Sequence, residues 1–313
     1  MGGKSIKVLV TGGAGFIGSH LCEALVNHGA QVVILDNLSS GNKDNCVPLV
    51  DSRKAQMIVG DCANPAVVRR ASYQADTIFH LSANPEVRLE LNDPKICFRE
   101  NVYATHVLLE TVKKDQTVTT IIFASSSTVY GEPNIIPTPE DYAPLEPISI
   151  YAGSKLASEA LVSSYCHTYR KQAVILRLAN VVGRRSRHGI VSDFVAKLRR
   201  NPSCLEILGD GQQSKSYLHI DDCVDAMVKA SKAGEATVEV FNVGSDDRIS
   251  SARIAEIVVE EMDLKDVRFE FTGTTWAGDV TNMLLDTTKL RSIGWRPRYH
   301  SEESIRLATK TWV

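Results

Sequence analysis

The chain has 313 residues, 43% hydrophobic and 23% charged, with a formal net charge of -2 at pH 7. This length allows one large α/β domain or two unequal lobes. The near-neutral charge argues against nucleic acid as a main partner, because binding to phosphate backbones needs a positive excess. No apolar run approaches the roughly 18 residues of a membrane span, and the segment before Val8 lacks the apolar stretch of a signal peptide.

The cysteines and histidines show no pattern of a disulfide framework or a metal site. Seven cysteines are scattered and never form a CxxC pair, which indicates free thiols in a reducing cytoplasm. Eight histidines show no HExxH or comparable ligand spacing. We therefore predict no metal.

Short apolar runs alternate with amphipathic segments in the first half of the chain. The predicted strands are Lys7–Thr11, Gln31–Asp36, Ala55–Gly60, Thr77–Leu81, Thr119–Ala124 and Ala173–Leu178. Apolar residues recur at helical spacing in Ile17–His28 and Phe98–Lys113. This order predicts right-handed crossovers and a doubly wound parallel sheet with helices on both faces. Near-continuous Val, Ile and Leu runs are typical of strands buried on both sides.

The second half changes in character after about Ala179. Loops, short helices and isolated strands rich in Gly, Pro and polar residues follow one another. A further strand, Glu239–Val243, is expected to return to the main sheet. Since no linker or low-complexity tract separates the halves, we predict a first domain over residues 1–178, to which 215–246 returns. A smaller, interwoven lobe covers 179–313.

A strand, a glycine turn and a helix start follow one another in Val8–Leu21. Gly12 permits the tight turn, Gly15 lets the backbone approach a pyrophosphate, and Gly18 lets the helix pack close to the strand. The helix N-terminus supplies oriented N–H groups to the phosphates. The spacing is GxxGxxG rather than the commoner GxGxxG, and a lone glycine motif is weak evidence because any strand-to-helix turn can need glycines.

The second predicted strand ends in Asp36. A carboxylate there can accept two hydrogen bonds from an adenosine ribose and repels a 2′-phosphate. No Arg or Lys immediately follows Asp36, so the sequence favours NAD over NADP. Asp61 closes the third strand, where its carboxylate can meet the adenine, although such a residue is more often only a turn residue.

Tyr151 and Lys155 stand four residues apart, on one face of a predicted helix. A tyrosine near its reference pKa of about 10 is a poor base at neutral pH, but a neighbouring ammonium and an oxidised nicotinamide both favour the phenolate. Lys155 can also hydrogen-bond the nicotinamide ribose. Because a YxxxK pattern is common by chance, a surface Tyr/Lys pair is the alternative interpretation.

Hydroxyl side chains in Phe123–Gly131 follow the end of a predicted strand, where parallel sheets place active sites. These hydroxyls can hydrogen-bond a substrate oxygen alongside Tyr151. The alternative, a polar loop without function, does not explain why the cluster follows a strand upstream of the tyrosine.

Together these residues resemble the extended short-chain dehydrogenase/reductase family and, within it, the UDP-glucose 4-epimerases. The matching segments run through nearly the whole chain: TGGAGFIGSHL, DNLSSG, VGD, HLSANPEV, SSSTVYG, YxxxK, LRLANVVG, GDGQQSKSYLHIDD, FNVGS and AGDV. The resemblance implies an α/β fold with a Rossmann-type doubly wound parallel sheet that binds NAD. The smaller, interwoven C-terminal lobe would bind a UDP-sugar.

The resemblance also implies the site residues. Those expected to line the NAD site are Gly12, Gly15, Phe16, Ile17, Gly18, Asp36, Asn37, Ser40, Gly41, Asp61, Leu81, Ser82, Ala83, Asn101, Ser125, Tyr151 and Lys155. The catalytic residues would be Tyr151, Lys155 and Ser126, with Ser127 as the close competitor of Ser126. Tyr151 would remove the 4-OH proton while C4 passes a hydride to NAD. The 4-keto sugar would then swing about its diphosphate and take the hydride back on its other face.

For the substrate, the resemblance assigns Asn180 to the diphosphate and Asp279 to the uridine end. Lys215 and Trp276 stand where the family often has arginine, and either change loses bidentate phosphate recognition. A basic cluster either replaces that contact or forms a solvated loop: Arg184, Arg185 and Arg187. His219 is expected to pack beneath the sheet.

Met283 aligns with a position whose bulk decides, in this family, whether an N-acetyl group fits, and a flexible Met leaves room. The sequence therefore predicts a 4-epimerase for UDP-glucose and UDP-galactose that also accepts UDP-GlcNAc and UDP-GalNAc. Ser127 and Thr128 follow Ser126 where the related 4,6-dehydratases and UDP-glucuronate decarboxylases carry acidic residues. Dehydration is therefore not expected, and decarboxylation is less expected than epimerisation.

Two other interpretations remain open. One is a UDP-glucuronate 4-epimerase or decarboxylase with the same base and cofactor. The other is a non-catalytic NAD(H)-binding sensor, although sensors tend to lose the tyrosine or the lysine, and both are present here.

The family resemblance also bears on assembly and location. Family members usually form dimers through a four-helix bundle built from the helices that carry Asn101 and Tyr151. The predicted helix Ala152–Tyr169 has apolar residues at suitable spacing, which can equally pack on the sheet: Leu156, Ala160, Leu161 and Tyr165. We therefore expect a cytoplasmic homodimer whose small-molecule partner is a UDP-sugar, with no nucleic acid and no membrane.

Overall fold

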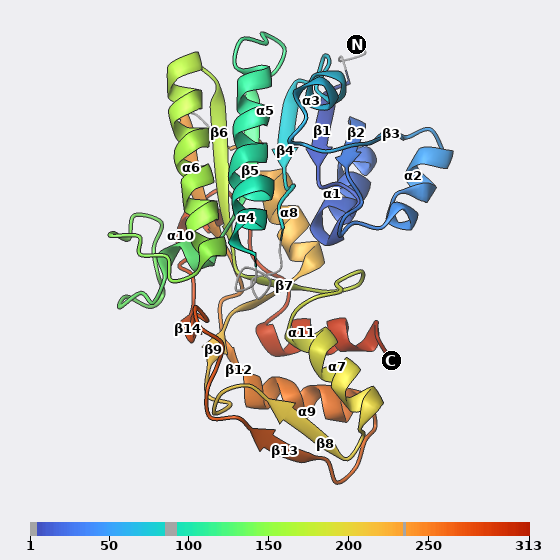
Figure 1. The fold of residues 1–313 in the computed structure, drawn as a ribbon, viewed down its shortest axis with the longest axis vertical. Coiled ribbons are helices and arrows are strands. Elements are labelled where there is room, and N and C mark those ends of the chain that lie inside the picture. Colours follow the sequence, from blue (N-terminus) through green and yellow to red (C-terminus); the bar gives the residue numbers. More distant parts are fainter. Residues whose placement is uncertain (1–4, 85–92, 234–235) are drawn as a thin grey trace. The chain divides into compact units, whose positions relative to one another are not determined.

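The computed structural model of the protein describes residues 5–84, 93–233 and 236–313. The chain divides into two units. Unit 1 comprises Met1–Ser126, Ile150–Arg177 and Val224–Phe241, and unit 2 comprises Ser127–Ser149, Leu178–Cys223 and Asn242–Val313. The chain therefore passes from one unit to the other repeatedly (Figure 1).

The main sheet has seven strands: β1 Lys7–Thr11, β2 Gln31–Asp36, β3 Ala55–Val59, β4 Thr77–His80, β5 Thr120–Ser126, β6 Gln172–Leu178 and β11 Val238–Val243. Their order in the sheet is β11-β6-β5-β4-β1-β2-β3. β1 pairs in parallel with β2 and β4, β2 with β3, and β4 with β5. The chain order reverses between β1 and β4, which is the switch point of a doubly wound sheet. The predicted Rossmann-type α/β fold is confirmed.

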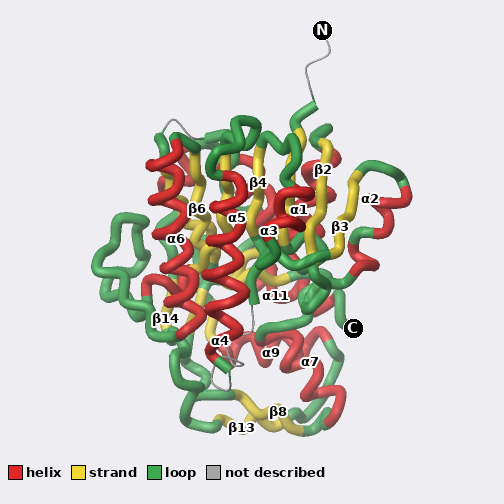
Figure 2. The backbone as a smooth tube through the Cα atoms, turned by 45° about the horizontal axis from the view of Figure 1, so that its top comes forward, coloured by secondary structure: helices red, strands yellow, loops and turns green. Residues whose placement is uncertain are grey.

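Helices cover this sheet. They are α1 Phe16–Asn27, α2 Val47–Asp51, α3 Pro65–Ala71, α4 Pro94–Cys97, α5 Ala104–Val112, α6 Ile150–Tyr169 and α8 Ile220–Ala230. Figure 2 shows α3, α5 and α6 in front of the strands. Apolar side chains from these helices and from the strands, such as Leu108, Val162 and Ile121, form one buried cluster. Successive strand residues such as Ile121, Ile122 and Phe123 are all buried, so burial on both faces explains the near-continuous apolar runs.

The helix expected over Phe98–Lys113 differs from the observed one. It begins earlier, at Pro94 in α4, where the side chain of Asp93 accepts a hydrogen bond from the Lys95 N–H. Phe98–Tyr103 then forms a π-helix before α5 begins. The apolar spacing of Phe98–Lys113 fits an ordinary helix and did not indicate this turn. Such π turns occur often at functional sites.

Unit 2 contains three small sheets. β7 Asn180–Val182 pairs with β10 Tyr217–His219, and β8 Cys204–Ile207 pairs with β13 Arg268–Phe271. β9 Ser214–Lys215 lies between β12 Ile249–Ser250 and β14 Asn282–Met283. The helices of unit 2 are α7 Ile190–Arg200, α9 Ser251–Glu261, α10 Thr288–Ser292 and α11 Ser301–Lys310. Apolar residues of α7, α9, α11 and β8 form its core.

Membrane-spanning helices, metal-binding clusters and the state of the cysteines also bear on function. In the described part of the chain, no helix is both long enough and apolar enough to cross a membrane. The same residues contain no group of three or more His, Cys, Asp and Glu side chains that could hold a metal ion. The seven cysteines are free thiols, and all except Cys204 are buried.

Candidate active site

The glycine turn between β1 and α1 requires glycine for steric reasons. Gly12 has a φ of 68°, and a Cβ on it would lie 2.9 Å from the backbone carbon of Leu81. A Cβ on Gly18 would lie 2.2 Å from the Gly12 carbonyl oxygen. Gly15 precedes the first residue of α1, Phe16, and has no side chain to cap that helix. The first N–H groups of α1, including that of Ile17, therefore remain available to an anion such as a pyrophosphate.

The carboxylate of Asp36 is held in place at the end of β2 and can accept further hydrogen bonds from a ligand. Its carboxylate accepts hydrogen bonds from the N–H groups of Ala14, at 2.9 Å, and Leu38, at 2.8 Å. A carboxylate has about four acceptor positions, so two remain for the hydroxyls of a ribose. A Cβ on Gly41 would lie 2.8 Å from Asp36 Oδ1. The loop that contains Asn37 and Ser40 can therefore close over the carboxylate only with glycine at this position.

Asp61 follows β3 and has a partner that the sequence did not predict. Its carboxylate accepts from the Ala63 N–H at 2.8 Å and forms an ion pair with Arg99, whose Nη2 lies 2.5 Å from Oδ2. Because Arg99 is far from Asp61 in sequence, no local pattern indicates this pair. The pair orients the carboxylate that is predicted to meet the adenine.

Asn101 lies in the π-helix and connects two segments of the predicted cofactor site. It is buried, with 2% exposed. Its Oδ1 accepts from the Asn84 N–H at 2.8 Å, and its Nδ2 donates to Ser154 Oγ at 2.8 Å. Ser154 in turn donates to the Tyr151 carbonyl at 2.7 Å. The loop after β4, which carries Leu81, Ser82 and Ala83, is thereby connected to the first turn of α6. Residues 85–87 of the HLSANPEV segment lie outside the described residues.

His80, at the end of β4, extends this network to the glycine turn. Its Nδ1 lies 2.7 Å from Thr11 Oγ1, and its Nε2 lies 2.9 Å from Thr105 Oγ1. Thr105 uses its hydroxyl proton to donate to the Asn101 carbonyl at 2.6 Å. His80 therefore donates from Nε2, and in the neutral ring Nδ1 accepts from Thr11. Burial lowers the pKa of His80 to about 3, in agreement with this assignment.

The candidate base and its lysine lie on α6. Lys155 is 4% exposed, and its Nζ donates to the Ala124 carbonyl at 2.9 Å. This Nζ lies 5.9 Å from the centroid of the Tyr151 ring and 5.1 Å from that of Phe123. Burial lowers the pKa of Lys155 to about 8, and the negative charge of Glu159 opposes that change. The ammonium is thus buried beside the tyrosine, where it favours the phenolate.

The serine cluster is divided among different environments. Ser126 is the last residue of β5 and is half-buried, whereas Ser127 begins a 3₁₀ turn, Ser127–Tyr130, and is 7% exposed. Ser125 is buried, and its hydroxyl donates to Glu159 on α6. Its hydroxyl therefore points to the helix. Ser126 has the greater accessibility that a hydroxyl needs to contact a substrate.

Unit 2 contains the residues predicted for the substrate. Lys215 Nζ lies 2.5 Å from Asp279 Oδ1, with side chains 19% and 9% exposed. Met283 on β14 lies opposite Lys215 on β9 and is 3% exposed. The structure thus brings Lys215 together with Asp279 and Met283, which lie more than 60 residues further along the chain. His219 packs edge-on against Tyr299, with ring centroids 5.1 Å apart.

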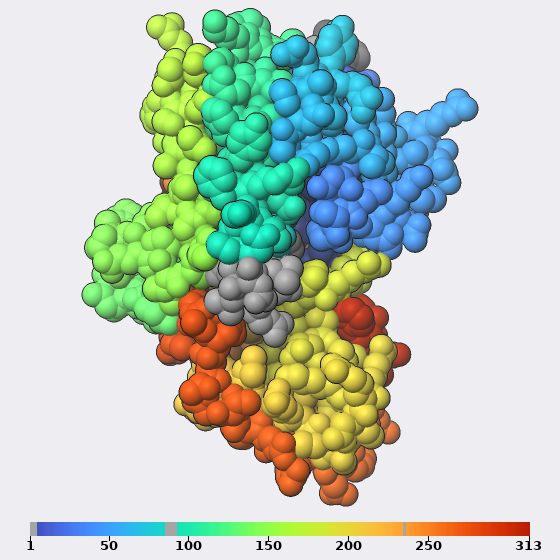
Figure 3. All heavy atoms as spheres, in the orientation of Figure 1, coloured from blue at the N-terminus to red at the C-terminus, as the bar shows by residue number. Residues whose placement is uncertain are grey.

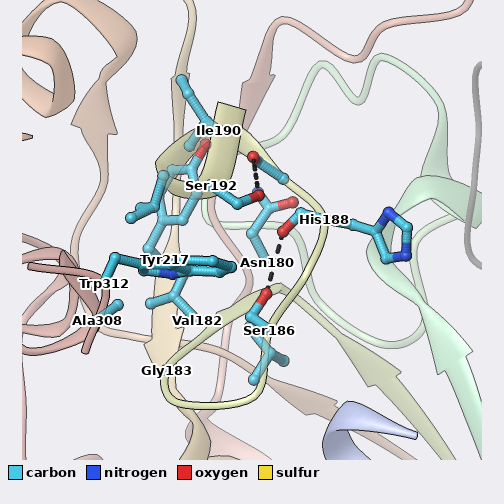
Figure 4. A pocket seen from close by; sticks show the side chains of 13 residues that line it. Asn180, Val182, Gly183, Ser186, His188, Ile190, Ser192, Tyr217, Ala308 and Trp312 are labelled. Atoms are coloured by element: carbon cyan, nitrogen blue, oxygen red, sulfur yellow. Dashed lines mark hydrogen bonds between the residues drawn. The ribbon is translucent and has the colours of Figure 1, made fainter. Parts of the chain in front are cut away.

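Asn180, exposed at the start of β7, lines a cavity of about 110 Å³ in unit 2 (Figure 4). Its Nδ2 donates to the Ser216 carbonyl at 3.4 Å. The cavity also contacts the first residues of α7, which follow Gly189, and the aromatic side chains of Tyr217 and Trp312. Figure 4 shows the His188 ring pointing away from these side chains. Tyr217 belongs to the GDGQQSKSYLHIDD segment, although the sequence assigned it no role, and no local pattern indicated Trp312.

Comparison with known proteins identifies the family. Residues 8–244 match the model of the NAD-dependent epimerase/dehydratase family. The chain is 32% identical over 305 residues to a putative UDP-glucose 4-epimerase of Methanocaldococcus jannaschii, with 96% of each chain covered. It is 30% identical over 316 residues to UDP-glucuronic acid decarboxylase 1 of Arabidopsis thaliana, with 97% of this chain and 69% of the relative covered.

Solved structures agree with this. A UDP-galactose 4-epimerase has a TM-score of 0.88 and is 41% identical, with 98% of each chain covered. A UDP-glucose 4-epimerase of Thermus thermophilus in complex with NAD has a TM-score of 0.88 and is 29% identical, with 98% of this chain and 99% of the other covered. The resemblance drawn from the sequence is confirmed, as is NAD as the cofactor. The chain belongs to the NAD-dependent epimerase/dehydratase family, within the extended short-chain dehydrogenase/reductases.

Proposed function

We propose that the protein is a UDP-sugar 4-epimerase that interconverts UDP-glucose and UDP-galactose through a 4-keto intermediate. The observation that carries this proposal is the buried Lys155 ammonium, 5.9 Å from the Tyr151 ring on the same helix. It lets Tyr151 take the 4-OH proton as a phenolate at neutral pH. Ser126, at the end of β5, orients the same oxygen. NAD, when bound, accepts the C4 hydride and returns it.

Overall identity does not separate the epimerases from the decarboxylases, because both occur at about 30% identity. Local chemistry favours epimerisation. Ser127 and Thr128 follow Ser126 and offer no carboxylate as the additional acid or base that dehydration requires. Glu159 lies near this strand end, but its carboxylate is bonded to Arg177 and Ser125. It is therefore not available to transfer a proton to a sugar.

For the UDP end of the substrate, we propose Asn180, Lys215 and Asp279 of unit 2. Lys215 replaces an arginine that is common in the family, and Asp279 fixes its ammonium. Met283, opposite Lys215, is proposed to leave room for an N-acetyl group, so that UDP-GlcNAc and UDP-GalNAc are also substrates. We propose that unit 1 binds NAD through the glycine turn, Asp36 and Asn101.

We also propose that the protein forms a homodimer in the cytoplasm. Figure 3 shows α5 and α6 side by side on one face of unit 1. Apolar side chains are exposed on the π-helix that precedes α5: Phe98 is 63% exposed and Tyr103 is 44% exposed. Leu161 and Tyr165 of α6, in contrast, pack against the core. The exposed apolar residues are the part of this surface that a second copy would cover.

A product analysis tests the proposed function. The purified protein is incubated separately with UDP-glucose, UDP-GlcNAc and UDP-glucuronate without added NAD, and the products are identified by NMR. Formation of a C4-epimer that is lost in Tyr151→Phe supports the proposal and identifies the sugar. Release of CO₂ or formation of a 4-keto-6-deoxy sugar contradicts it. Absence of any product with NAD bound would favour the non-catalytic sensor.

A further inference from the structure

A buried ion pair joins α6 to β6, about two helical turns along α6 from the candidate base Tyr151. Arg177 on β6 and Glu159 on α6 both have side chains 6% exposed, and Arg177 Nη2 donates to Glu159 Oε2 at 2.9 Å. Arg177 Nε also donates to Oε1 at 3.2 Å. The third member is Ser125 on β5, whose Oγ donates to Oε1 at 2.5 Å. One carboxylate thus connects three neighbouring elements of unit 1.

Ser125 links the Arg177–Glu159 ion pair to the candidate catalytic residues. Ser125 stands between Ala124, whose carbonyl accepts the Lys155 hydrogen bond, and Ser126, the candidate catalytic hydroxyl. The end of β5 is therefore bound to α6 at two consecutive residues, by Lys155 at Ala124 and by Glu159 at Ser125. Tyr151, Lys155 and Glu159 occupy successive turns of one helix, so these two bonds set the distance between Ser126 and Tyr151.

Stability alone is a weak reason for such a pair. Removing two charges from water costs about as much as their attraction returns, and an apolar replacement of equal volume is often neutral or stabilising. A buried carboxylate one helical turn from a buried ammonium does have an electrostatic consequence. Its charge opposes the effect of burial, which lowers the pKa of Lys155 to about 8.

We propose that Glu159 is a positioning residue of the proposed epimerase site: through Ser125 it fixes the Ser126 hydroxyl relative to Tyr151 and Lys155. This inference rests on the proposed function. Glu159 does not contact substrate itself. It acts by holding the end of β5 and by keeping a negative charge near Lys155, so its loss changes the rate of the chemical step and the pH dependence rather than substrate binding.

Several titratable or charged groups near Lys155 can affect the pH at which it loses its charge. Tyr151 and Glu159 lie on its own helix, Arg177 on β6 and His80 on β4. His80 is neutral above a pH of about 3 because burial lowers its pKa, and Arg177 stays charged. Glu159 is therefore the negative charge that a substitution can remove. Without it the pKa of Lys155 falls further, and the alkaline limb of kcat moves to lower pH.

The experiment compares two substitutions in the full-length protein with NAD bound. Ser125→Ala leaves the ion pair intact and removes only the bond to β5. It is expected to lower kcat about 10- to 100-fold, as a small misplacement of reacting groups does, with little change in KM for UDP-glucose. Glu159→Gln keeps an acceptor for Ser125 but removes the charge. It is expected to move the alkaline limb of kcat to lower pH.

A matched control separates positioning from destabilisation. Lys171 is also a buried cation of unit 1, 8% exposed, and its Nζ donates to the carbonyls of Asp115 and Val118 at 2.7 Å each. Lys171→Met is expected to lower the unfolding temperature without changing kcat or its pH profile. If Glu159→Gln does not fold because Arg177 is left unpaired, the double variant Glu159→Gln/Arg177→Met removes both charges.

The double variant keeps the acceptor for Ser125, so it is expected to be more active than Ser125→Ala. The inference is overturned if Ser125→Ala and Glu159→Gln show the kcat and alkaline limb of the wild type. It is equally overturned if these two variants, like Lys171→Met, lower the unfolding temperature but leave kcat and its pH profile unchanged. Wild-type turnover is measured first: if the wild type forms no epimer, the proposed function fails, whereas an active wild type with unaffected variants contradicts this inference alone.

Discussion

Lys215 and Asp279 form an ion pair in unit 2, with Nζ 2.5 Å from Oδ1 and the carboxylate side chain only 9% exposed. The pair joins two residues that the sequence assigned separately to the substrate. A lysine held in this way presents a fixed point charge, whereas arginine in its place presents two parallel N–H donors to a phosphate.

From this pair follows a prediction for substrate affinity. Lys215→Ala is expected to raise KM for the UDP-sugar about tenfold with little effect on kcat, because the charge contacts the non-reacting end. Lys215→Arg is expected to retain or lower KM. Steady-state kinetics measure both. Lys197→Ala, which removes an ion pair with Glu206 on the surface of unit 2, is the control and should leave KM unchanged. If KM is the same in the wild type and in all these variants, Lys215 does not contact the substrate.

The pH dependence of activity should report Lys155. Burial lowers its pKa to about 8, so the ammonium that favours the Tyr151 phenolate is lost as the pH rises through this value. The ratio kcat/KM, which reflects the free enzyme, is expected to decline above pH of about 8. A profile of kcat/KM against pH checks this. An unchanged ratio from pH 7 to 10 would show that the charge on Lys155 is not needed.

His80 should make the protein sensitive to acid. An ordinary histidine in the unfolded chain binds a proton below about pH 6.5, whereas burial lowers the pKa of His80 in the folded protein to about 3. Stability therefore falls as the pH decreases between these values, by about 2 kcal/mol at pH 5 from this residue.

Urea unfolding at pH 7 and pH 5 measures this effect. His80→Gln can still bond to Thr11 and Thr105 but does not titrate, so its difference in stability between the two pH values should be smaller than that of the wild type. His106→Gln, which changes a histidine near the surface, provides the comparison. The same pH difference in wild type and His80→Gln would contradict the assignment of a neutral His80.

Met283 is the residue expected to govern the choice of sugar. It is 3% exposed and lies opposite Lys215. Met283→Tyr adds bulk and is expected to reduce activity on UDP-GlcNAc at least about tenfold relative to UDP-glucose. Met283→Leu conserves volume and should leave this ratio unchanged. If Met283→Tyr leaves the ratio unchanged as well, the N-acetyl group lies elsewhere.

The sequence predicted those parts of the fold and the site that depend on local patterns. Buried strands appear as apolar runs, and the conformation at Gly12 excludes any Cβ, so both leave a clear trace in the sequence. β1 and β2 have the predicted bounds, and the ends of the other strands differ from the prediction by at most two residues. The π-helix was missed because the apolar periodicity of Phe98–Lys113 fits an ordinary helix.

Partners brought together by the fold were not predictable. Arg99 pairs with Asp61 across 38 residues of sequence, and Arg177 on β6 pairs with Glu159 on the preceding helix, α6. Arg and Glu are common on protein surfaces, so nothing in the residue types shows that this pair is buried. The neutral state of His80 similarly depends on its burial in the folded protein, where Thr11 and Thr105 from two other elements contact its ring.

The central claim is that C4 of the sugar gives up a hydride and receives the same hydride back. The most direct measurement uses UDP-glucose labelled with deuterium at C4, in ordinary water, with NMR analysis of the UDP-galactose formed. We predict that the product retains the deuterium at C4, because the hydride passes to the bound cofactor and returns without exchange. UDP-galactose without deuterium at C4, or conversion without any inversion at C4, would contradict the account.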